Sequence, residues 1–174
     1  MRSVGELLEL EKWVAGEQPK PRKASHLGHQ GWNIGLEVAD PDAGSFTVIV
    51  RVNQVLHESF TVGLRYQERG SQALMLLRVN GDHGGHGNPD GSRIESGPHL
   101  HAPTAAERLL PPPVRDWSTG PPTALPLAVE HNNLLVAWNR LIAEGNIRPS
   151  EAISKFMSGV QGRLAQLVAE GLFS

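Results

Sequence analysis

The stretch WNIGLEVADPDAGSFTVIVRV, residues 32–52, decides the fold of this chain. Apolar residues stand at every second position of 32–38 and again of 46–52. A period of two is typical of a strand that buries one face. Between the two runs, Asp40-Pro41-Asp42-Ala43-Gly44 is a strong turn signal, because Pro fixes φ and Gly tolerates turn geometry. The stretch therefore predicts two antiparallel strands joined by a tight turn.

Further strands follow along the chain. Residues 60–67 repeat the alternation, and the run 73–79 is almost continuously apolar, which indicates a central strand covered on both faces. Pro98–Ala102 predicts a short fifth strand, and 127–129 a short strand or extended segment. The short connections favour an antiparallel meander.

Helices are predicted at both ends of the chain. Ser3 and Glu6 form a capping-box pattern before a helix over 4–15, and residues 17–30 form a polar linker. Asn132 or Asn133 caps a helix over 133–144, and Ser150 caps the last one. The predicted class is α+β: an antiparallel sheet of about five strands, an N-terminal helix and two C-terminal helices. We expect a single domain, 1–174, with the sheet and a histidine-bearing loop in 30–130 and a helical tail in 131–174.

Composition excludes several classes of protein. The 174 residues include no cysteine, so disulfide frameworks, thiolate nucleophiles and Cys-ligated zinc are excluded. The formal net charge of -2 provides no general basic field for nucleic acid. No apolar run has the length of a membrane span and no signal-peptide pattern opens the chain, so we expect a soluble cytoplasmic protein without membrane contact.

Chemistry-bearing residues gather in the segment 80–126, where 16 of 47 positions are Gly or Pro. Long loops of this kind are often functional. Asn88-Pro89-Asp90-Gly91 is a well-defined turn that brings His86 toward the strand at 98–102. His99 and His101 share one face of that strand by the period-two rule. His83 stands between an aspartate and two glycines and is interpreted as a mobile loop residue; His26, His29, His57 and His131 are interpreted as ordinary surface or capping groups.

Two chemistries use such a cluster. A His pair acting as base and acid cleaves RNA when an Arg or Lys stabilises the phosphorane charge, and Arg65, Arg78 and Arg93 are candidates for that group. Alternatively, His86, His99 and His101 ligate a divalent metal ion. The sequence does not decide between the two.

The runs Leu76-Leu77-Arg78-Val79-Asn80, His86-Gly87-Asn88-Pro89-Asp90-Gly91 and Pro98-His99-Leu100-His101 resemble an uncharacterised domain family of small bacterial and phage proteins. The resemblance covers about residues 60–102. The resemblance implies that the protein is a component of mobile elements. The family's histidine pattern is similar in style to that of metal-independent ribonuclease toxins. Asn80 departs from the family pattern, which has Asp there, and the segment after His101 lacks the family's aromatic residues.

The leading hypothesis is a metal-independent, ribonuclease-like toxin or defence protein. His99 and His101 would be its acid–base pair, His86 a third participant and Arg78 an electrostatic stabiliser. The alternative is a non-catalytic phage or mobile-element module that binds or inhibits a host protein, and the third reading is a His-ligated, metal-dependent hydrolase. The expected partners are RNA or a host protein, with a homo-oligomer through the C-terminal helix as a further possibility.

Overall fold

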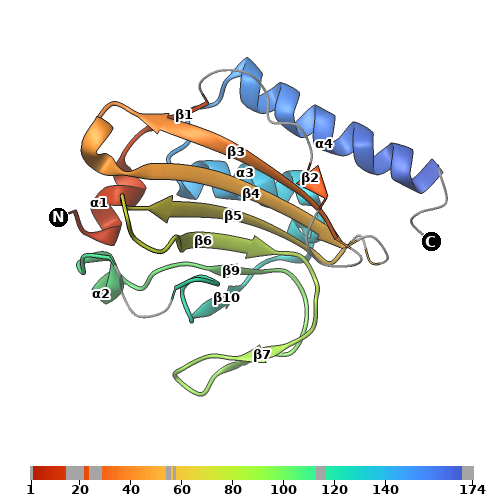
Figure 1. Ribbon diagram of the computed structural model, residues 1–174. Coiled ribbons are helices and arrows are strands. Elements are labelled where there is room, and N and C mark those ends of the chain that lie inside the picture. The colour runs from red at the N-terminus through yellow and green to blue at the C-terminus, as the bar shows by residue number, and fades with distance from the viewer. Residues whose placement is uncertain are drawn as a thin grey trace.

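The fold is α+β, as predicted, and its centre is one large antiparallel sheet (Figure 1). The computed structural model describes residues 2–14, 22–23, 29–53, 56, 58–112 and 117–169. Helix α3 (Leu134–Glu144) packs against strands β5 (Phe60–Gln67) and β6 (Leu74–Asn80), and α4 (Glu151–Ala169) runs past the side of the sheet that carries β3 (His29–Val38). Among the described residues, no helix is both long and apolar enough to cross a membrane.

Seven strands follow one another across the sheet in the order β1-β3-β4-β5-β6-β9-β10, and β2 also pairs with β3. Their bounds are β1 Lys12–Trp13, β2 Arg22–Lys23, β3 His29–Val38, β4 Ser45–Asn53, β5 Phe60–Gln67, β6 Leu74–Asn80, β9 His99–His101 and β10 Ala124–Pro126. A separate hairpin joins β7 (His86–Gly87) to β8 (Arg93–Ile94). The meander β3-β4-β5-β6 confirms the four long predicted strands and their order.

The predicted count of five strands was too low, and one position was wrong. The last strand is β10 at 124–126 rather than 127–129. Strands of two or three residues contain one alternation or less, so periodicity does not detect them. Pro126 is compatible with this place because β10 is an edge strand, where a missing N–H breaks no ladder.

The N-terminal helix is shorter than predicted. Its capping box is present, with the Ser3 hydroxyl accepting from the Glu6 amide, but α1 spans only Val4–Glu9. The chain then becomes extended at Leu10, and β1 pairs with β3, with Lys12 opposite Val38. Of the predicted linker 17–30, residues 22–23 and 29–30 are strand and the others lie outside the described residues.

The core lies between the sheet and the C-terminal helices. Both helices are confirmed: Asn133 caps α3, and the Ser150 hydroxyl accepts from the Ile153 amide at the start of α4. The rings of Trp138 and Phe156 pack with centroids 5.4 Å apart. The α4 stripe is buried in the chain's own core at Ile153, Phe156, Met157 and Val160. One short α-helix, α2 (Ala105–Arg108), and two 3-10 turns, Pro41–Ala43 and Val129–Asn132, complete the described fold.

A buried lysine connects the two ends of the chain. The side chain of Lys12 is fully buried, and its Nζ donates to the carbonyls of Leu8 at 3.1 Å, Leu10 at 2.7 Å and Gly145 at 2.9 Å. Its backbone adds hydrogen bonds to the loop between α3 and α4, from Lys12 N to Asn146 O and from Arg148 N to Lys12 O. One ammonium thus satisfies the carbonyls that end α1 and α3.

Replacing this lysine should destabilise the fold. The variant Lys12→Met keeps the aliphatic stem but leaves buried carbonyls without donors, and we expect a loss of roughly 2–4 kcal/mol in the free energy of unfolding. Urea denaturation measures it. Lys155→Met is the matched control, because Lys155 makes an exposed pair with Glu151, and it should change stability by less than about 0.5 kcal/mol. Equal effects of the two substitutions would contradict this role of Lys12.

Candidate functional site

Four side chains of the candidate site come from the paired strands β6 and β9. In the antiparallel register Arg78 lies opposite His101, and Asn80 lies opposite His99. Because side chains alternate along a strand, all four project from the same face of the sheet. Val79 and Leu100, which lie between them, belong to the hydrophobic core on the other face. The sheet therefore places the polar cluster on the side away from α3.

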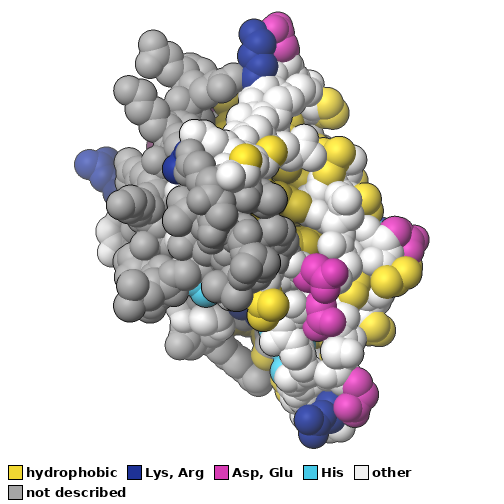
Figure 2. All heavy atoms as spheres, turned by 90° about the vertical axis from the view of Figure 1, so that its right-hand side faces the viewer, with side chains coloured by type: hydrophobic (Ala, Val, Ile, Leu, Met, Phe, Trp, Pro, Cys, Tyr) yellow, Lys and Arg dark blue, Asp and Glu magenta, His cyan; other side chains and the backbone are white. Residues whose placement is uncertain are grey.

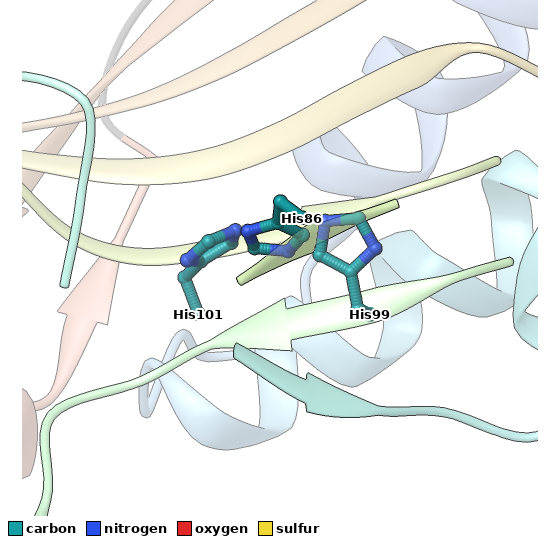
Figure 3. A group of neighbouring side chains, drawn as sticks. All are labelled: His86, His99 and His101. Carbon is teal, nitrogen blue, oxygen red and sulfur yellow. The ribbon is translucent and has the colours of Figure 1, made fainter. Parts of the chain in front are cut away.

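The hairpin β7–β8 adds His86 to this pair of strands. Figure 3 shows the three rings of His86, His99 and His101 turned toward one another. One nitrogen from each ring lies within 4.8 Å of the others. The centroid of the His86 ring is 4.7 Å from that of His99 and 5.0 Å from that of His101. The three histidines singled out in the sequence are thus brought together.

His99 is fully buried, and both its ring nitrogens have partners. Nδ1 is 2.9 Å from the Gly97 carbonyl oxygen, which can only accept, so Nδ1 carries the proton. Nε2 then accepts from the Asn80 amide nitrogen at 3.0 Å. The Thr61 hydroxyl, which donates to the Asn80 amide oxygen at 2.9 Å, fixes that amide orientation. Burial lowers the pKa of His99 to about 4, so the ring is neutral at pH 7.

His101 repeats the arrangement with a charged donor. Its Nδ1 donates to the Pro121 carbonyl at 2.8 Å, and its Nε2 accepts from Nη2 of Arg78 at 2.7 Å. Burial, with the adjacent charge of Arg78, lowers the pKa of His101 to about 3. The two residues predicted as an acid–base pair are therefore neutral rings held by two hydrogen bonds each.

Among the described residues, Arg78 has no anionic partner. The side chain is half-buried, its Nε is buried without a hydrogen-bond partner, and no carboxylate of the described residues forms an ion pair with it. Burial lowers the pKa of Arg78, but a guanidinium stays charged at pH 7. A charge removed from water is costly unless it is paired. The guanidinium is thus prepared to bind an anion.

His86 also has an unused nitrogen. The ring is half-buried, and its Nε2 is buried with no hydrogen-bond partner among the described residues. Burial lowers the pKa of His86, and His83 and Arg78 lower it further because their positive charges oppose protonation. His86 is therefore a neutral imidazole at pH 7 whose ring has the more solvent-accessible position of the three.

The structure places a fourth histidine, His83, beside the other three, whereas the sequence analysis interpreted it as a mobile loop residue. Its exposed ring meets His99 edge-on, with centroids 4.8 Å apart, and lies 6.5 Å from the ring of His86. The preceding Asp82 holds this loop: its Oδ1 accepts from the amides of Gly84 at 3.3 Å and Gly97 at 3.0 Å. The local sequence does not predict the position of His83, because the loop is held by a contact between Asp82 and Gly97, which are 15 residues apart.

Asp82 has a second long-range contact, since its amide donates to Oδ1 of Asn132 at 2.8 Å. The amide hydrogen bonds to Asp82 lower the pKa of its carboxyl group, so the carboxylate stays ionised. The carboxylate of Asp82 thus accepts hydrogen bonds from the backbone of its own loop. Arg78, by contrast, contacts a ring of the cluster directly, through the hydrogen bond from its Nη2 to His101.

The other candidates lie elsewhere. His29 is in β3, and His131 caps its own turn by a contact with the Ala128 carbonyl at 3.2 Å. Arg65 is on β5, and Arg93 is on the hairpin beside Glu95 at 3.8 Å. His26 and His57 lie outside the described residues. On the face in Figure 2 the described Lys and Arg side chains are scattered and form no broad basic patch among the coloured residues.

The neutral state of the buried rings predicts the pH dependence of stability. Unfolded histidine has a pKa of about 6.5. The pKa values of about 4 for His99 and 3 for His101 mean that, as pH falls below 6.5, the unfolded chain binds protons first. Stability should therefore fall from pH 7 to pH 4, with a slope of up to roughly 1.4 kcal/mol per pH unit for each ring.

Urea unfolding in EDTA at several pH values measures this slope. His101→Asn removes one titrating ring and should flatten the slope, whereas His131→Asn, outside the cluster, should leave it unchanged. A wild-type stability that does not change between pH 7 and pH 4 would contradict the neutral assignment.

Comparison with known proteins found no match: no family model fits the chain, and no curated protein or solved structure is significantly similar to it.

Proposed function

We propose that this protein cleaves phosphodiester bonds in RNA by acid–base catalysis without a metal ion. The observation that supports it most strongly is the half-buried guanidinium of Arg78, which has no carboxylate partner among the described residues and lies beside a group of imidazoles. Guanidinium groups match the geometry of phosphate, and imidazoles move protons near neutral pH. A cation that lacks a counter-ion favours an anionic substrate.

In this proposal Arg78 binds the phosphate that reacts. Its Nε has a free hydrogen, and Nη2 already donates to His101, so the guanidinium is oriented before substrate arrives. Negative charge grows on the non-bridging oxygens as the phosphorane forms. A pre-oriented donor in a site with little water stabilises that charge more than bulk water does.

We assign proton transfer to His86 and His83. Their ring centroids are 6.5 Å apart, which is close enough for both rings to contact one phosphodiester. One ring removes the proton from the ribose 2′-hydroxyl, whose oxygen then attacks phosphorus. The other ring, as imidazolium, donates its proton to the departing 5′-oxygen, and the products are a 2′,3′-cyclic phosphate and a 5′-hydroxyl. A bound phosphate favours the imidazolium because opposite charges attract.

His99 and His101 support these groups rather than touch substrate. Both are buried, and all four of their ring nitrogens have partners. His101 orients Arg78, and His99 packs against the rings of His83 and His86. This division of roles differs from the sequence hypothesis, in which the strand pair His99 and His101 transferred the protons.

Cleavage of single-stranded RNA in excess EDTA is the direct assay. We expect His86→Ala and Arg78→Ala each to lower kcat/KM by roughly 100- to 1,000-fold, because each removes a transition-state contact. Arg65→Ala is the matched control: this arginine is half-buried on the adjacent strand β5, and its loss should change kcat/KM by less than about threefold.

DNA of the same sequence should not be cleaved, since it lacks the 2′-hydroxyl. Binding of RNA without cleavage would instead indicate a non-catalytic module. Unchanged cleavage in both site variants would refute the assignment.

A metal-dependent hydrolase is the second candidate, because nitrogens of His86, His99 and His101 lie within 4.8 Å of one another. Neutral rings whose Nδ1 atoms donate to carbonyls are also typical of metal ligands. However, Arg78 and Asn80 donate to the two Nε2 atoms that an ion would use. An ion would have to displace both donors and would lie beside the charge of Arg78.

Zinc distinguishes the two candidates. We expect Arg78→Ala to bind zinc more tightly than the wild type in calorimetry, because a competing donor and a repelling charge are lost. Zinc should inhibit RNA cleavage by the wild type, and EDTA should restore it. Cleavage that is abolished by EDTA and restored by zinc would favour the metal-dependent hydrolase instead.

A further inference from the structure

We infer that Asn88 is a positioning residue, whose side chain fixes the hairpin β7–β8 to the edge strand β10 and so sets the place of His86. The role in catalysis rests on the proposed function, whereas the positioning itself does not. Asn88 stands two residues after His86, at the start of the hairpin turn. The turn residues around it were predicted from sequence, but this contact was not.

The side-chain amide of Asn88 makes the two hydrogen bonds that a neighbouring strand would make to Ala124. Its Nδ2 donates to the Ala124 carbonyl at 2.9 Å, and its Oδ1 accepts from the Ala124 amide at 2.8 Å. The pair of hydrogen bonds is the one that an opposite residue makes in an antiparallel ladder. Nδ2 also donates to the Ser92 hydroxyl at 3.0 Å, which joins the contact to the far side of the turn.

The contact leads directly to the histidine cluster. Ala124 lies opposite His101 in the pairing of β10 with β9. Asn88 therefore ties the strand that carries His86 to the backbone position that faces His101. Because only Gly87 separates His86 from Asn88, a loss of this contact shifts the His86 ring relative to His101.

The hairpin has few other means of staying in place. Strands β7 and β8 form their own sheet of two strands, with His86 opposite Ile94 and Gly87 opposite Arg93. Figure 1 shows the hairpin extending from the edge of the main sheet. An isolated hairpin is at best marginally stable in water. Buried Ile94 supplies an apolar contact, and Asn88 supplies the directional one.

A double-mutant cycle on RNA cleavage tests the role. We expect Asn88→Ala to lower kcat by roughly 10- to 100-fold with little change in KM, because a misplaced proton-transfer group slows the chemical step. In the His86→Ala background the same substitution should cause no further loss. Asn88→Asp, which keeps the Ala124 amide contact and loses the donor, should fall between the wild type and Asn88→Ala.

Asp90→Ala is the matched control in the same turn. It removes the contacts of Asp90 with the Ser92 amide at 2.9 Å and hydroxyl at 2.7 Å but leaves the pair between Asn88 and Ala124 intact. It should change kcat by less than about threefold. If the losses from Asn88→Ala and His86→Ala multiply in the double variant, Asn88 does not act through His86 and the inference is overturned.

An NMR measurement, which does not depend on RNA cleavage, tests the positioning role separately from the proposed function. The NMR resonance of the His86 Cε1 proton should move in Asn88→Ala and stay in place in Asp90→Ala. If the wild type does not cleave RNA and the resonance still moves, the proposed function fails and the positioning role stands. If the resonance does not move, the positioning role is wrong, whatever the activity.

Discussion

The pairing of β6 with β9 is the constraint on which the site depends. It sets Arg78 opposite His101 and Asn80 opposite His99, so two donors meet two acceptors across a single ladder. A shift of one residue would turn every one of these side chains to the other face. The same shift would move Val79 and Leu100 out of the core, so the hydrophobic effect enforces the register of the polar cluster.

The cluster combines neutral rings with one uncompensated positive charge. The carbonyls of Gly97 and Pro121 select the tautomer of His99 and His101, and that tautomer turns the Nε2 atoms toward Asn80 and Arg78. Arg78 thus points in a fixed direction, and no carboxylate in the described part of the chain forms an ion pair with it. The formal net charge of -2 provides no basic field over the whole molecule, so in the proposed function the attraction of RNA rests on this local charge.

The sequence predicted the elements that depend on local patterns, and it missed those that depend on contacts between residues far apart along the chain. Strands β3, β4 and β5 each span eight residues or more and show an alternation of apolar and polar residues, and β6 shows an almost continuous apolar run, so the sequence displays all four. The convergence of His86, His99 and His101 was predicted because period two and one defined turn place them. By contrast, β1, β2 and β10 are too short for a period.

The missed site residues depend on partners far along the chain. Asp82 contacts Asn132, and Asn88 contacts Ala124, separations of 50 and 36 residues. No local pattern encodes these contacts. They decide where His83 and His86 lie, so the sequence identified the residue types of the site but could not assign their roles.

Asn80 shows how one atom sets the charge of the site. Nδ2 of Asn80 donates to His99, whereas a carboxylate there would only accept, and His99 would need a proton on Nε2 while its Nδ1 still donates to Gly97. An aspartate would thus favour an imidazolium and place an anion near Arg78. With asparagine, His99 stays neutral and no carboxylate stands at this position, which fits the proposed binding of a phosphate by Arg78.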